Sequence, residues 1–531
     1  MDQKTGTISP KPPKWMPVSA WLVIVLLYAI RFGYDYGASD QDEMLPYVLA
    51  LKDPSLYPHD WFVQQLVSHA NVRTFFAWAL YAVHAVFPLA WAVFLGYLAC
   101  WWTILQYMYR IAAAVSRNEW AGWLATLLGV VVFHKITIGS NDAVYNLLAP
   151  ELVGWAFALP ALYAGWQNRW TFSGLLLGIA SCFHFITGFT TALVLLAVLF
   201  TTQGQQKNRR KFWLNYGLSA LPILLVIGLG QIHQTSAPST PSSTEIQFWI
   251  RLPLHHFAAY YADRFWGFWL MILAGGWGFW DLKRRKHLRH EAFLRSFWMV
   301  SGLLMLLGWI GLEVFHWGFI GKFQFYKLAV WWKMFALALF SGAIMTRIPL
   351  RHRQAAAPMI RRTLPALGLL LSLYVSASLM TQSGRPYQKM PLFYTDSSLA
   401  EMESWIQRNT PKSALFAVPP SNTTFRSHAR RSIVINWLGF PFEDHAMYVW
   451  WTKLRDLTGV SHFQHRTALT ALDEGFNRNI LRGIRSAWVP PNGLTRQYCL
   501  IEKKRLHQPL PSPMVHQNRD WALYACKTGP L

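Results

Sequence analysis

The sequence predicts an α-helical polytopic membrane protein with a small mixed α/β region at its C-terminal end. Three observations lead to this fold class. The 531-residue chain is 53% hydrophobic and 14% charged, with a mean hydropathy of +0.20, whereas soluble domains carry about 25% charged residues. Its apolar residues gather in runs close to the ~20 residues that a membrane-spanning helix needs. After Met380 these runs stop, and shorter helix and strand patterns follow.

Eleven apolar runs are expected to cross the membrane, about eleven transmembrane helices in all. The first, residues 15–30, follows a basic N-terminus and lacks a small-residue cleavage site, so we expect an uncleaved anchor rather than a signal peptide. The later runs centre on residues 95–112, 120–133, 151–166, 171–184, 187–201, 213–231, 265–280, 296–313, 327–346 and 364–380. The two runs on either side of His184 could form one long segment or two short ones.

The placement of Lys and Arg sets the expected orientation. The net charge is +24, which in a soluble protein would suggest a nucleic-acid partner; none is expected here. With the N-terminus inside, the inner segments hold 21 Lys or Arg and the outer loops hold 7. Basic residues accumulate in cytoplasmic loops, so the N-terminus is predicted inside and the C-terminal region outside. The same alternation favours two segments around His184.

This topology predicts three regions: a cytoplasmic N-terminus at 1–14, a transmembrane domain at 15–381 with its first extracytoplasmic loop at 34–74, and an extracytoplasmic α/β domain at 382–531. Within the last region, Leu399, Met402, Trp405 and Ile406 share one helix face. A second helix is expected at 443–457, and strands at 414–418, 432–436, 487–489 and 521–526. Cys499 and Cys526 could pair if this region meets an oxidising compartment.

An acidic cluster, Ser39-Asp40-Gln41-Asp42-Glu43, directly follows the first run. Crowded carboxylates repel one another unless a cation, a metal or a proton relieves them, and general bases exploit this. The candidate catalytic residues are Asp42, Asp40 and Glu43. Asp42 is the candidate base and Asp40 its alternative, while Asp40 and Glu43 are expected to raise the proton affinity of Asp42. The competing interpretation is an ordinary solvated loop. Asp60 is interpreted as a helix cap.

Further polar residues lie near the outer ends of the runs. Candidate substrate-binding residues are Asp142, Glu151, Arg251, Lys322, Lys327 and Lys333. An ionisable residue inside a span, such as Lys333, is a functional candidate by default, although it could also snorkel to the interface. The histidines near the runs (His84, His134 and His184) are interpreted as hydrogen-bonded packing residues. The arginines of the C-terminal region (Arg426, Arg430 and Arg431) could meet an anionic ligand, but a solvated face is favoured.

The first loop also carries a recognisable order of motifs. Asp42-Glu43 precedes an amphipathic stretch, Met44 to Leu49, expected to lie along the membrane surface, and then His59-Asp60-Trp61-Phe62. This order resembles the GT-C superfamily of membrane glycosyltransferases, which includes protein O-mannosyltransferases and lipid A aminoarabinose transferases. His59 stands where the superfamily usually has glycine, and Asp142 matches its second acid. The segments 405–416 and 425–432 are similar to a family of uncharacterised bacterial membrane proteins.

The resemblance implies transfer of a sugar from a polyprenyl-phosphate carrier to a glycan, lipid or protein acceptor on the outer face of the bacterial inner membrane. Such a transfer needs a carboxylate to accept the proton of the acceptor hydroxyl and cations that face the leaving phosphate. One of Lys322, Lys327 and Lys333 is therefore expected within reach of Asp42. A divalent cation is the only cofactor left open. The alternatives are a transporter or flippase of a lipid-linked sugar, disfavoured because no internal repeat is evident, and a non-catalytic membrane scaffold protein; a glycan polymerase or ligase is a near neighbour of the main hypothesis.

Overall fold

The computed structural model describes residues 16–201, 206–232, 241–258, 262–349, 365–374, 398–461, 468–481, 496–506 and 512–526, together with a few single positions. The chain forms two compact units. Unit 1 comprises Met1–Tyr34, Phe94–Leu224 and Leu254–Met390, and unit 2 comprises Asp35–Val93, Leu225–Pro253 and Pro391–Leu531. Residues that directly follow the first predicted span thus belong to the same unit as the C-terminal residues.

The regular secondary structure of unit 1 is helical in the residues described. Its main helices are α1 (Met16–Phe32), α5 (Leu89–Ser116), α6 (Glu119–Leu127), α7 (Pro150–Trp166), α8 (Trp170–Phe183), α9 (Phe185–Thr201), α10 (Gln206–Ile232), α13 (Ala262–Arg284), α14 (Glu291–Trp309) and α16 (Ala329–Arg347). Short turns complete it: α12 (Pro253–His256), α15 (Gly318–Gly321), the π-helices η1 (Leu128–Val132) and η5 (Ile310–Val314), and the 3-10 turns η2 (Ile138–Ser140) and η6 (Phe325–Leu328).

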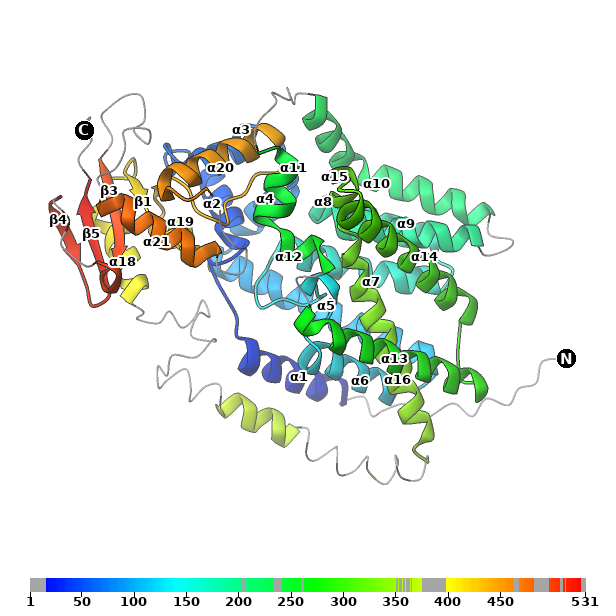
Figure 1. Ribbon diagram of the computed structural model, residues 1–531. Helices are drawn as coiled ribbons and strands as arrows, with labels where there is room; N and C mark the ends of the chain where they lie inside the picture. Colours follow the sequence, from blue (N-terminus) through cyan, green and yellow to red (C-terminus); the bar gives the residue numbers. More distant parts are fainter. Residues whose placement is uncertain are drawn as a thin grey trace. The chain divides into compact units, whose positions relative to one another are not determined.

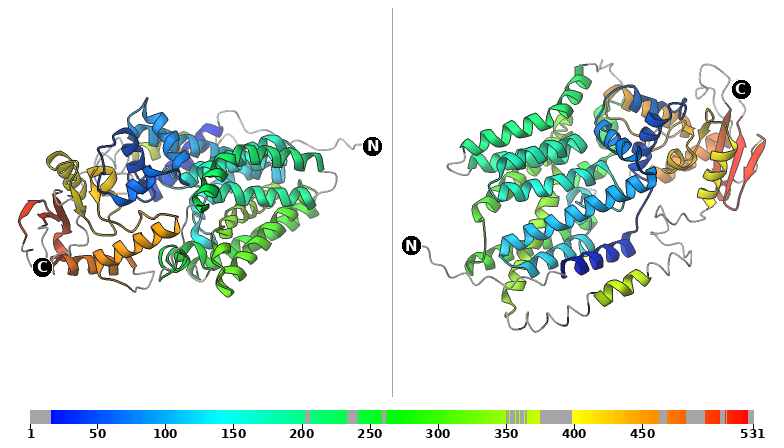
Figure 2. Two further views of the ribbon diagram at one scale, coloured as in Figure 1. Left: turned by 90° about the horizontal axis from the view of Figure 1, so that it is seen from above. Right: turned by 180° about the vertical axis from the view of Figure 1, so that it is seen from behind.

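These helices pack side by side as a bundle, seen in cyan and green in Figure 2. α7 packs against α8 and α9, and α13 packs against α16. Glycines permit the closest of these approaches, because a Cβ on Gly275 would lie 2.5 Å from the Cα of Ala336 and one on Gly278 would lie 2.6 Å from the backbone of Leu339. Small residues at helix contacts are typical of membrane bundles.

Four of the described helical stretches are long and apolar enough to cross a membrane: Leu89–Ser116, Lys207–Gly230, Glu291–Val314 and Gly318–Arg347. Shorter apolar helices lie at Ala20–Phe32, Glu119–Val132, Trp170–Phe183, Phe185–Thr201 and Pro365–Tyr374. Leu218, Leu273 and Leu303 are each more than 60% exposed. Such exposure is unfavourable in water and favourable against lipid, so the chain is a membrane protein.

A helix occupies each of the eleven predicted apolar runs, although only Pro365–Tyr374 of the last run falls on described residues. The uncertain pair of runs forms two helices. α8 ends at Phe183, α9 begins at Phe185, and the backbone of His184 between them is extended, with φ −144° and ψ 94°. The number of membrane crossings and the sidedness of the termini stay predictions.

Unit 2 combines short helices with one five-stranded sheet. Its helices are α2 (Gln41–Lys52), α3 (Trp61–Ser68), α4 (Thr74–His84), α11 (Ser243–Glu245), the π-helix η3 (Ile246–Arg251), α18 (Ser398–Asn409), α19 (Phe425–Ala429), α20 (Asp444–Thr458), α21 (Ala468–Leu481) and the 3-10 turn η10 (Lys503–Arg505). Its strands are β1 (Leu415–Ala417), β2 (Ser432–Ile433), β3 (Gln497–Glu502), β4 (Met514–Gln517) and β5 (Trp521–Ala525), in the order β2-β1-β3-β5-β4.

The two faces of the sheet are covered by different helices, because alternate residues of a strand point to opposite faces. Phe416, Leu500 and Leu523 pack with residues of α18 and α19, whereas their strand neighbours pack with residues of α20 and α21. Figure 1 shows α18 and α21 beside the strands. The sheet is mixed, since β1 is parallel to β2 and β3, and β5 is antiparallel to β3 and β4.

Most secondary structure predicted after residue 398 is confirmed where it falls on described residues. The expected helices are α18, in which Met402 and Ile406 are buried, and α20; the expected strands include β1, β2 and β5. The strand expected at 487–489 lies outside the described residues. β3 was missed because its residues 498–501 are buried on both faces, and a short continuous apolar run lacks the alternation that signals a strand.

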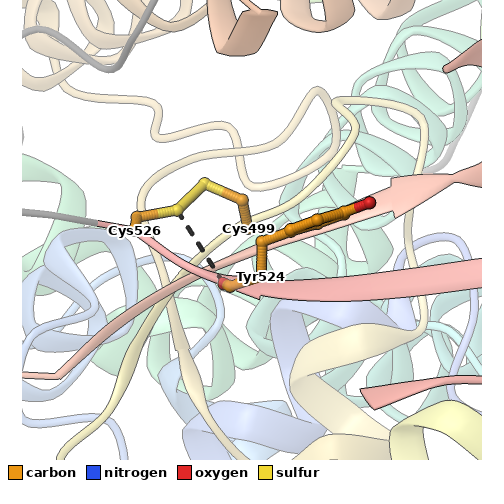
Figure 3. Close-up of a disulfide and its surroundings, with 3 residues drawn as sticks. All are labelled: Cys499, Tyr524 and Cys526. Carbon is orange, nitrogen blue, oxygen red and sulfur yellow. Dashed lines mark hydrogen bonds between the residues drawn. A yellow bond between two sulfur atoms is a disulfide. The ribbon is translucent and has the colours of Figure 1, made fainter. Parts of the chain in front are cut away.

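Cys499 and Cys526 form a disulfide with a Cα–Cα distance of 6.1 Å (Figure 3). Cys499 lies opposite Tyr524 in the β3–β5 register, and Cys526 follows two residues later on the same face. The sulfur of Cys526 also lies 4.0 Å from the backbone oxygen of Tyr524. The pairing that the sequence left open is therefore present, and it joins the end of β5 to β3.

Candidate functional site

The acidic cluster lies at the start of helix α2. Ser39 adopts a left-handed conformation with φ 54°, Asp40 is the residue before the first turn, and Asp42 and Glu43 lie within that turn. Acidic side chains at a helix N-terminus are stabilised by the helix dipole. Residues 41–50 are all buried, so the segment expected to be amphipathic and to lie along the membrane surface is instead enclosed by protein. The amphipathic interpretation was wrong because the order of polar and apolar residues along the chain does not reveal which other parts of the protein cover this segment.

Asp42 is fully buried, and one of its oxygens receives both of its hydrogen bonds. Nη1 of Arg426 donates to Oδ2 of Asp42 over 3.0 Å, and Nδ2 of Asn436 donates to the same oxygen over 2.6 Å. Oδ1 of Asp42 is also buried but has no hydrogen-bond partner among the described residues. The carboxylate thus has one fixed oxygen and one oxygen with unused acceptor capacity.

The guanidinium of Arg426 is shared between Asp42 and a second buried carboxylate, Asp60. Its Nε donates to Oδ2 of Asp60 over 2.8 Å, and Nη2 donates to Oδ1 over 3.3 Å. Two carboxylates therefore compete for one cation. Burial raises the pKa of Asp42 to about 7, because it outweighs the opposing effects of Arg426 and Asn436, and the negative charge of Asp60 adds to the rise. A carboxylate with such a pKa can exchange protons near neutral pH.

A second buried group surrounds Glu43. Nε of Arg73 donates to Oε2 of Glu43 over 2.7 Å, and Nη2 of Arg73 donates to the carbonyl oxygen of Phe440 over 2.7 Å. Arg251, from η3, lies with its guanidinium carbon 5.1 Å from the ring centre of Trp437. Burial lowers the pKa of Arg251 to about 10, against the opposing charges of Glu43 and Asp40. Nε of Arg251 is buried and has no hydrogen-bond partner within the described part of the chain.

The structure corrects the expected cause of the raised proton affinity. We expected repulsion from Asp40 and Glu43, but Asp40 is exposed and Glu43 is paired with Arg73. The carboxylate that raises the pKa of Asp42 is Asp60, which comes second to burial among the raising causes. Asp60 also caps α3 as predicted, since its Oδ1 accepts a hydrogen bond from the backbone N–H of Val63 over 3.1 Å.

Lys333 and Asp142 form a second buried ion pair, in unit 1. Nζ of Lys333 donates to Oδ2 of Asp142 over 2.6 Å and to the carbonyl oxygens of Gly129 and Phe133 over 3.2 and 3.3 Å. The side chain is fully buried, so the snorkelling interpretation of Lys333 was wrong. An ammonium has three donors, and all three of them are used within the protein.

The other candidates of unit 1 differ in their surroundings. Lys327 is buried, and its Nζ donates to Oε2 of Glu151 over 2.7 Å. Lys322 is exposed, directly after α15. The predicted packing histidines are hydrogen-bonded, with Nδ1 of His184 lying 2.8 Å from Oγ1 of Thr187. His134 lies with its Nδ1 3.1 Å from Oδ2 of Asp142.

The arginines of the C-terminal segment (residues 398–526) are the principal correction. A solvated face was favoured for them, yet Arg426 is fully buried and Arg431 is 4% exposed. Arg431 donates to the carbonyl oxygens of Gln407 and Thr410. Arg426 could have been identified only by pairing charges that lie far apart in the sequence, because its two carboxylate partners, Asp60 and Asp42, are more than 360 residues away. Asn436 carried no sequence signal at all.

No group of three or more His, Cys, Asp or Glu side chains suited to holding a metal ion occurs among the described residues. The cationic side chains next to Asp42 and Glu43 are Arg426, Arg73 and Arg251. These guanidinium groups place positive charge beside the two carboxylates.

Comparisons with known proteins concern the C-terminal segment and the whole chain. Residues 397–457 match the family described as "Domain of unknown function (DUF6798)", and no curated protein matches the sequence. Two similar solved structures are ArnT from Cupriavidus metallidurans. The one bound to undecaprenyl phosphate has 14% identity and a TM-score of 0.41, covering 96% of this chain and 98% of that chain. The apo structure has 12% identity and a TM-score of 0.45, covering 97% and 99%.

At these identities and TM-scores, the likeness to ArnT assigns no function to this chain.

Proposed function

We propose that the protein is a membrane glycosyltransferase that moves a sugar from a polyprenyl-phosphate donor to an acceptor hydroxyl on the outer face of the inner membrane. The observation that carries this proposal is the state of Asp42. It is a buried carboxylate with a pKa of about 7 and one oxygen that has no partner among the described residues. Perturbed carboxylates of this kind are typical of catalytic sites.

In the proposed reaction, Oδ1 of Asp42 accepts the proton of the acceptor hydroxyl. The acceptor oxygen then bonds to the anomeric carbon of the sugar, the bond from that carbon to the carrier phosphate oxygen breaks, and its electron pair leaves on the phosphate. Negative charge grows on the phosphate as this bond breaks, so a preorganised cation stabilises the transition state. Asp40, exposed and two residues earlier, is the alternative base.

Arg251 is the best-supported cation for the phosphate. It lies in the same unit as Asp42, and its Nε has no hydrogen-bond partner within the described residues. Lys333 and Lys327 have their ammonium groups bound to Asp142 and Glu151, which makes them less suited to a direct contact than the sequence suggested. Lys322 stays a candidate because it is exposed. We therefore propose that Asp142 holds Lys333 and Glu151 holds Lys327, and that these two acids do not bind the sugar.

The test compares matched acid variants in purified full-length protein. We expect Asp42→Asn to lower transfer from undecaprenyl-phosphate-linked sugars by about 10²–10⁴-fold, the usual contribution of a general base. Asp40→Asn should leave the rate nearly unchanged, and Asp60→Asn should affect stability more than turnover. Arg251→Gln should weaken the binding of undecaprenyl phosphate. Native transfer rates in both Asp42→Asn and Asp40→Asn would exclude the first loop as the active site.

A non-catalytic scaffold is the second candidate, because Asp42 is completely buried in an ionic network that also suits a structural role. A scaffold would lose stability in Asp42→Asn and would show no transfer with any donor.

The proposed location of the C-terminal segment is the outer side of the membrane. The Cys499–Cys526 disulfide supports it, because disulfides persist in oxidising compartments. Reporter fusions after Gln382 test this topology. A reporter that is active only in the cytoplasm would contradict both the orientation and the outer active site.

A further inference from the structure

A buried ionic network in unit 2 joins residues of the first loop to residues of the C-terminal segment. The first loop supplies Asp42 and Asp60, and the C-terminal segment supplies Arg426 from α19 and Asn436 beyond β2. Other contacts join the same two stretches: Oη of Tyr57 donates to the carbonyl oxygen of Arg426 over 2.7 Å. The network is therefore part of a continuous contact and not a single chance pair.

Asn436 is fixed in one orientation by its own hydrogen bonds. Its Oδ1 accepts from Nη1 of Arg426 over 2.8 Å and from the backbone N–H of Gly439 over 2.9 Å. Its Nδ2 donates to Asp42 and to the carbonyl oxygen of Asn422, the latter over 3.0 Å. Both donors of the C-terminal segment therefore meet Oδ2 of Asp42, and neither meets Oδ1.

We propose that Arg426 and Asn436 are positioning residues for Asp42, which bind its Oδ2 and leave its Oδ1 as the proton-accepting oxygen. The C-terminal segment would then complete the active site of the first loop rather than form a separate appendage. This inference rests on the proposed function, in which Asp42 is the base. It also gives a role to residues within the matched family of unknown function, since Arg426 and Asn436 both lie between residues 397 and 457.

The charged groups around Asp42 determine how its proton affinity responds to substitution. Arg426 lowers the pKa of Asp42, Asn436 lowers it through its hydrogen bond, and Asp60 raises it. Other charged or titratable groups lie near Asp42 and Asp60. Glu43 is paired with Arg73, burial raises the pKa of the Tyr57 phenol, which also interacts electrostatically with Arg430, and Lys453 of α20 interacts electrostatically with Asp60. Removing the Asn436 side chain should therefore raise the pKa of Asp42, and removing the charge of Asp60 should lower it.

The experiment is an infrared titration of the protonated carboxyl band in full-length protein in detergent, without substrate. The band that disappears in Asp42→Asn belongs to Asp42. We expect Asn436→Ala to move its midpoint to higher pH and Asp60→Asn to move it to lower pH, each by about one unit. Ser432→Ala is the matched control, because the Oγ of Ser432 accepts from the backbone N–H of His59 over 3.2 Å and is not among the hydrogen-bond donors to Asp42 in the described residues. This variant should leave the midpoint unchanged.

Transfer assays with undecaprenyl-phosphate-linked sugars complete the test. The pH at which transfer rises should follow the infrared midpoint in each variant, with the effect on kcat rather than on KM. Arg426→Lys should keep part of the activity and Arg426→Met should lose it. Equal midpoints in Asn436→Ala and Asp60→Asn would overturn the positioning role and leave the proposed function standing. Shifted midpoints combined with native transfer by Asp42→Asn would instead overturn the proposed function.

Discussion

Asp42 in unit 2 and Asp142 in unit 1 are both buried aspartates that contact a buried cation, yet their pKa values shift in opposite directions. Burial by itself raises the pKa of each. For Asp142 this effect is outweighed by the Lys333 ammonium and by His134, which hold the pKa below its ordinary value. For Asp42 burial prevails, and the pKa rises to about 7. A buried ion pair alone therefore does not determine the charge state of an acid.

The difference lies in the number of partners that each carboxylate has. Both oxygens of Asp142 are bound: Oδ2 accepts from Lys333 and from the backbone N–H of Lys135 over 2.6 Å each, and Oδ1 accepts from the N–H of Ala143 over 2.7 Å. Asp42 has only one bound oxygen and shares its cation with Asp60. The contacts of Asp142 therefore favour its ionised form, whereas burial of Asp42 favours its protonated form.

Arg426→Met should produce the largest loss of stability, because it leaves two buried carboxylates without their shared cation. Breaking a buried pair typically costs about 3–5 kcal/mol, and we expect a value at the upper end. Thermal unfolding in detergent measures it. The double variant Arg426→Met with Asp60→Asn should recover part of the loss, since one stranded charge is removed. A single variant as stable as the native protein would show that Arg426 is not the counter-charge of this cluster.

Lys333→Met should cost less, at about 3 kcal/mol, the lower end of the same range. Asp142 would keep the backbone N–H groups of Lys135 and Ala143 as hydrogen-bond donors. Combining Lys333→Met with Asp142→Asn removes the stranded charge and should restore most of the stability. If the single variant also lost binding of undecaprenyl phosphate while its unfolding temperature stayed native, Lys333 would contact the lipid directly and the structural role would be wrong.

The sequence predicted the helices far better than the contacts between distant residues. Each apolar run became a helix, and the break at His184 was visible because the charge alternation required it. α18 was predicted from the spacing of Leu399, Met402 and Ile406, since a helix face repeats every three or four residues. These features depend on local sequence, which is why they could be predicted.

The candidate site was only partly predictable, because its partners come from opposite ends of the chain. Asp42 was identified from local crowding of acids, but its cation Arg426 lies 384 positions away. A cluster of three arginines normally indicates a solvated surface, and nothing local distinguishes a buried Arg426 from an exposed Arg430. Asp60 was recognised as a cap, yet its effect on Asp42 depends on a fold that brings the start of α3 close to α2.

The pH dependence of stability separates the two aspartates most directly. The pKa of Asp42 rises from 3.8 to about 7 on folding, so the folded protein binds more protons than the unfolded chain between these values. Its contribution to stability is therefore complete below about pH 4 and is lost as the pH rises to about 7.

Asp142 behaves oppositely, because its lowered pKa contributes stability that is complete above its ordinary range and is lost only in acid. Asp42→Asn should flatten the decline of the unfolding temperature between about pH 4 and pH 7, whereas Asp142→Asn should lower that temperature without changing the slope. The measurement is the unfolding temperature of native protein and of Asp42→Asn across this pH range. Parallel curves for the two proteins would show that Asp42 is permanently ionised, as Asp142 is. Asp42 would then not be suited to act as a base near neutral pH.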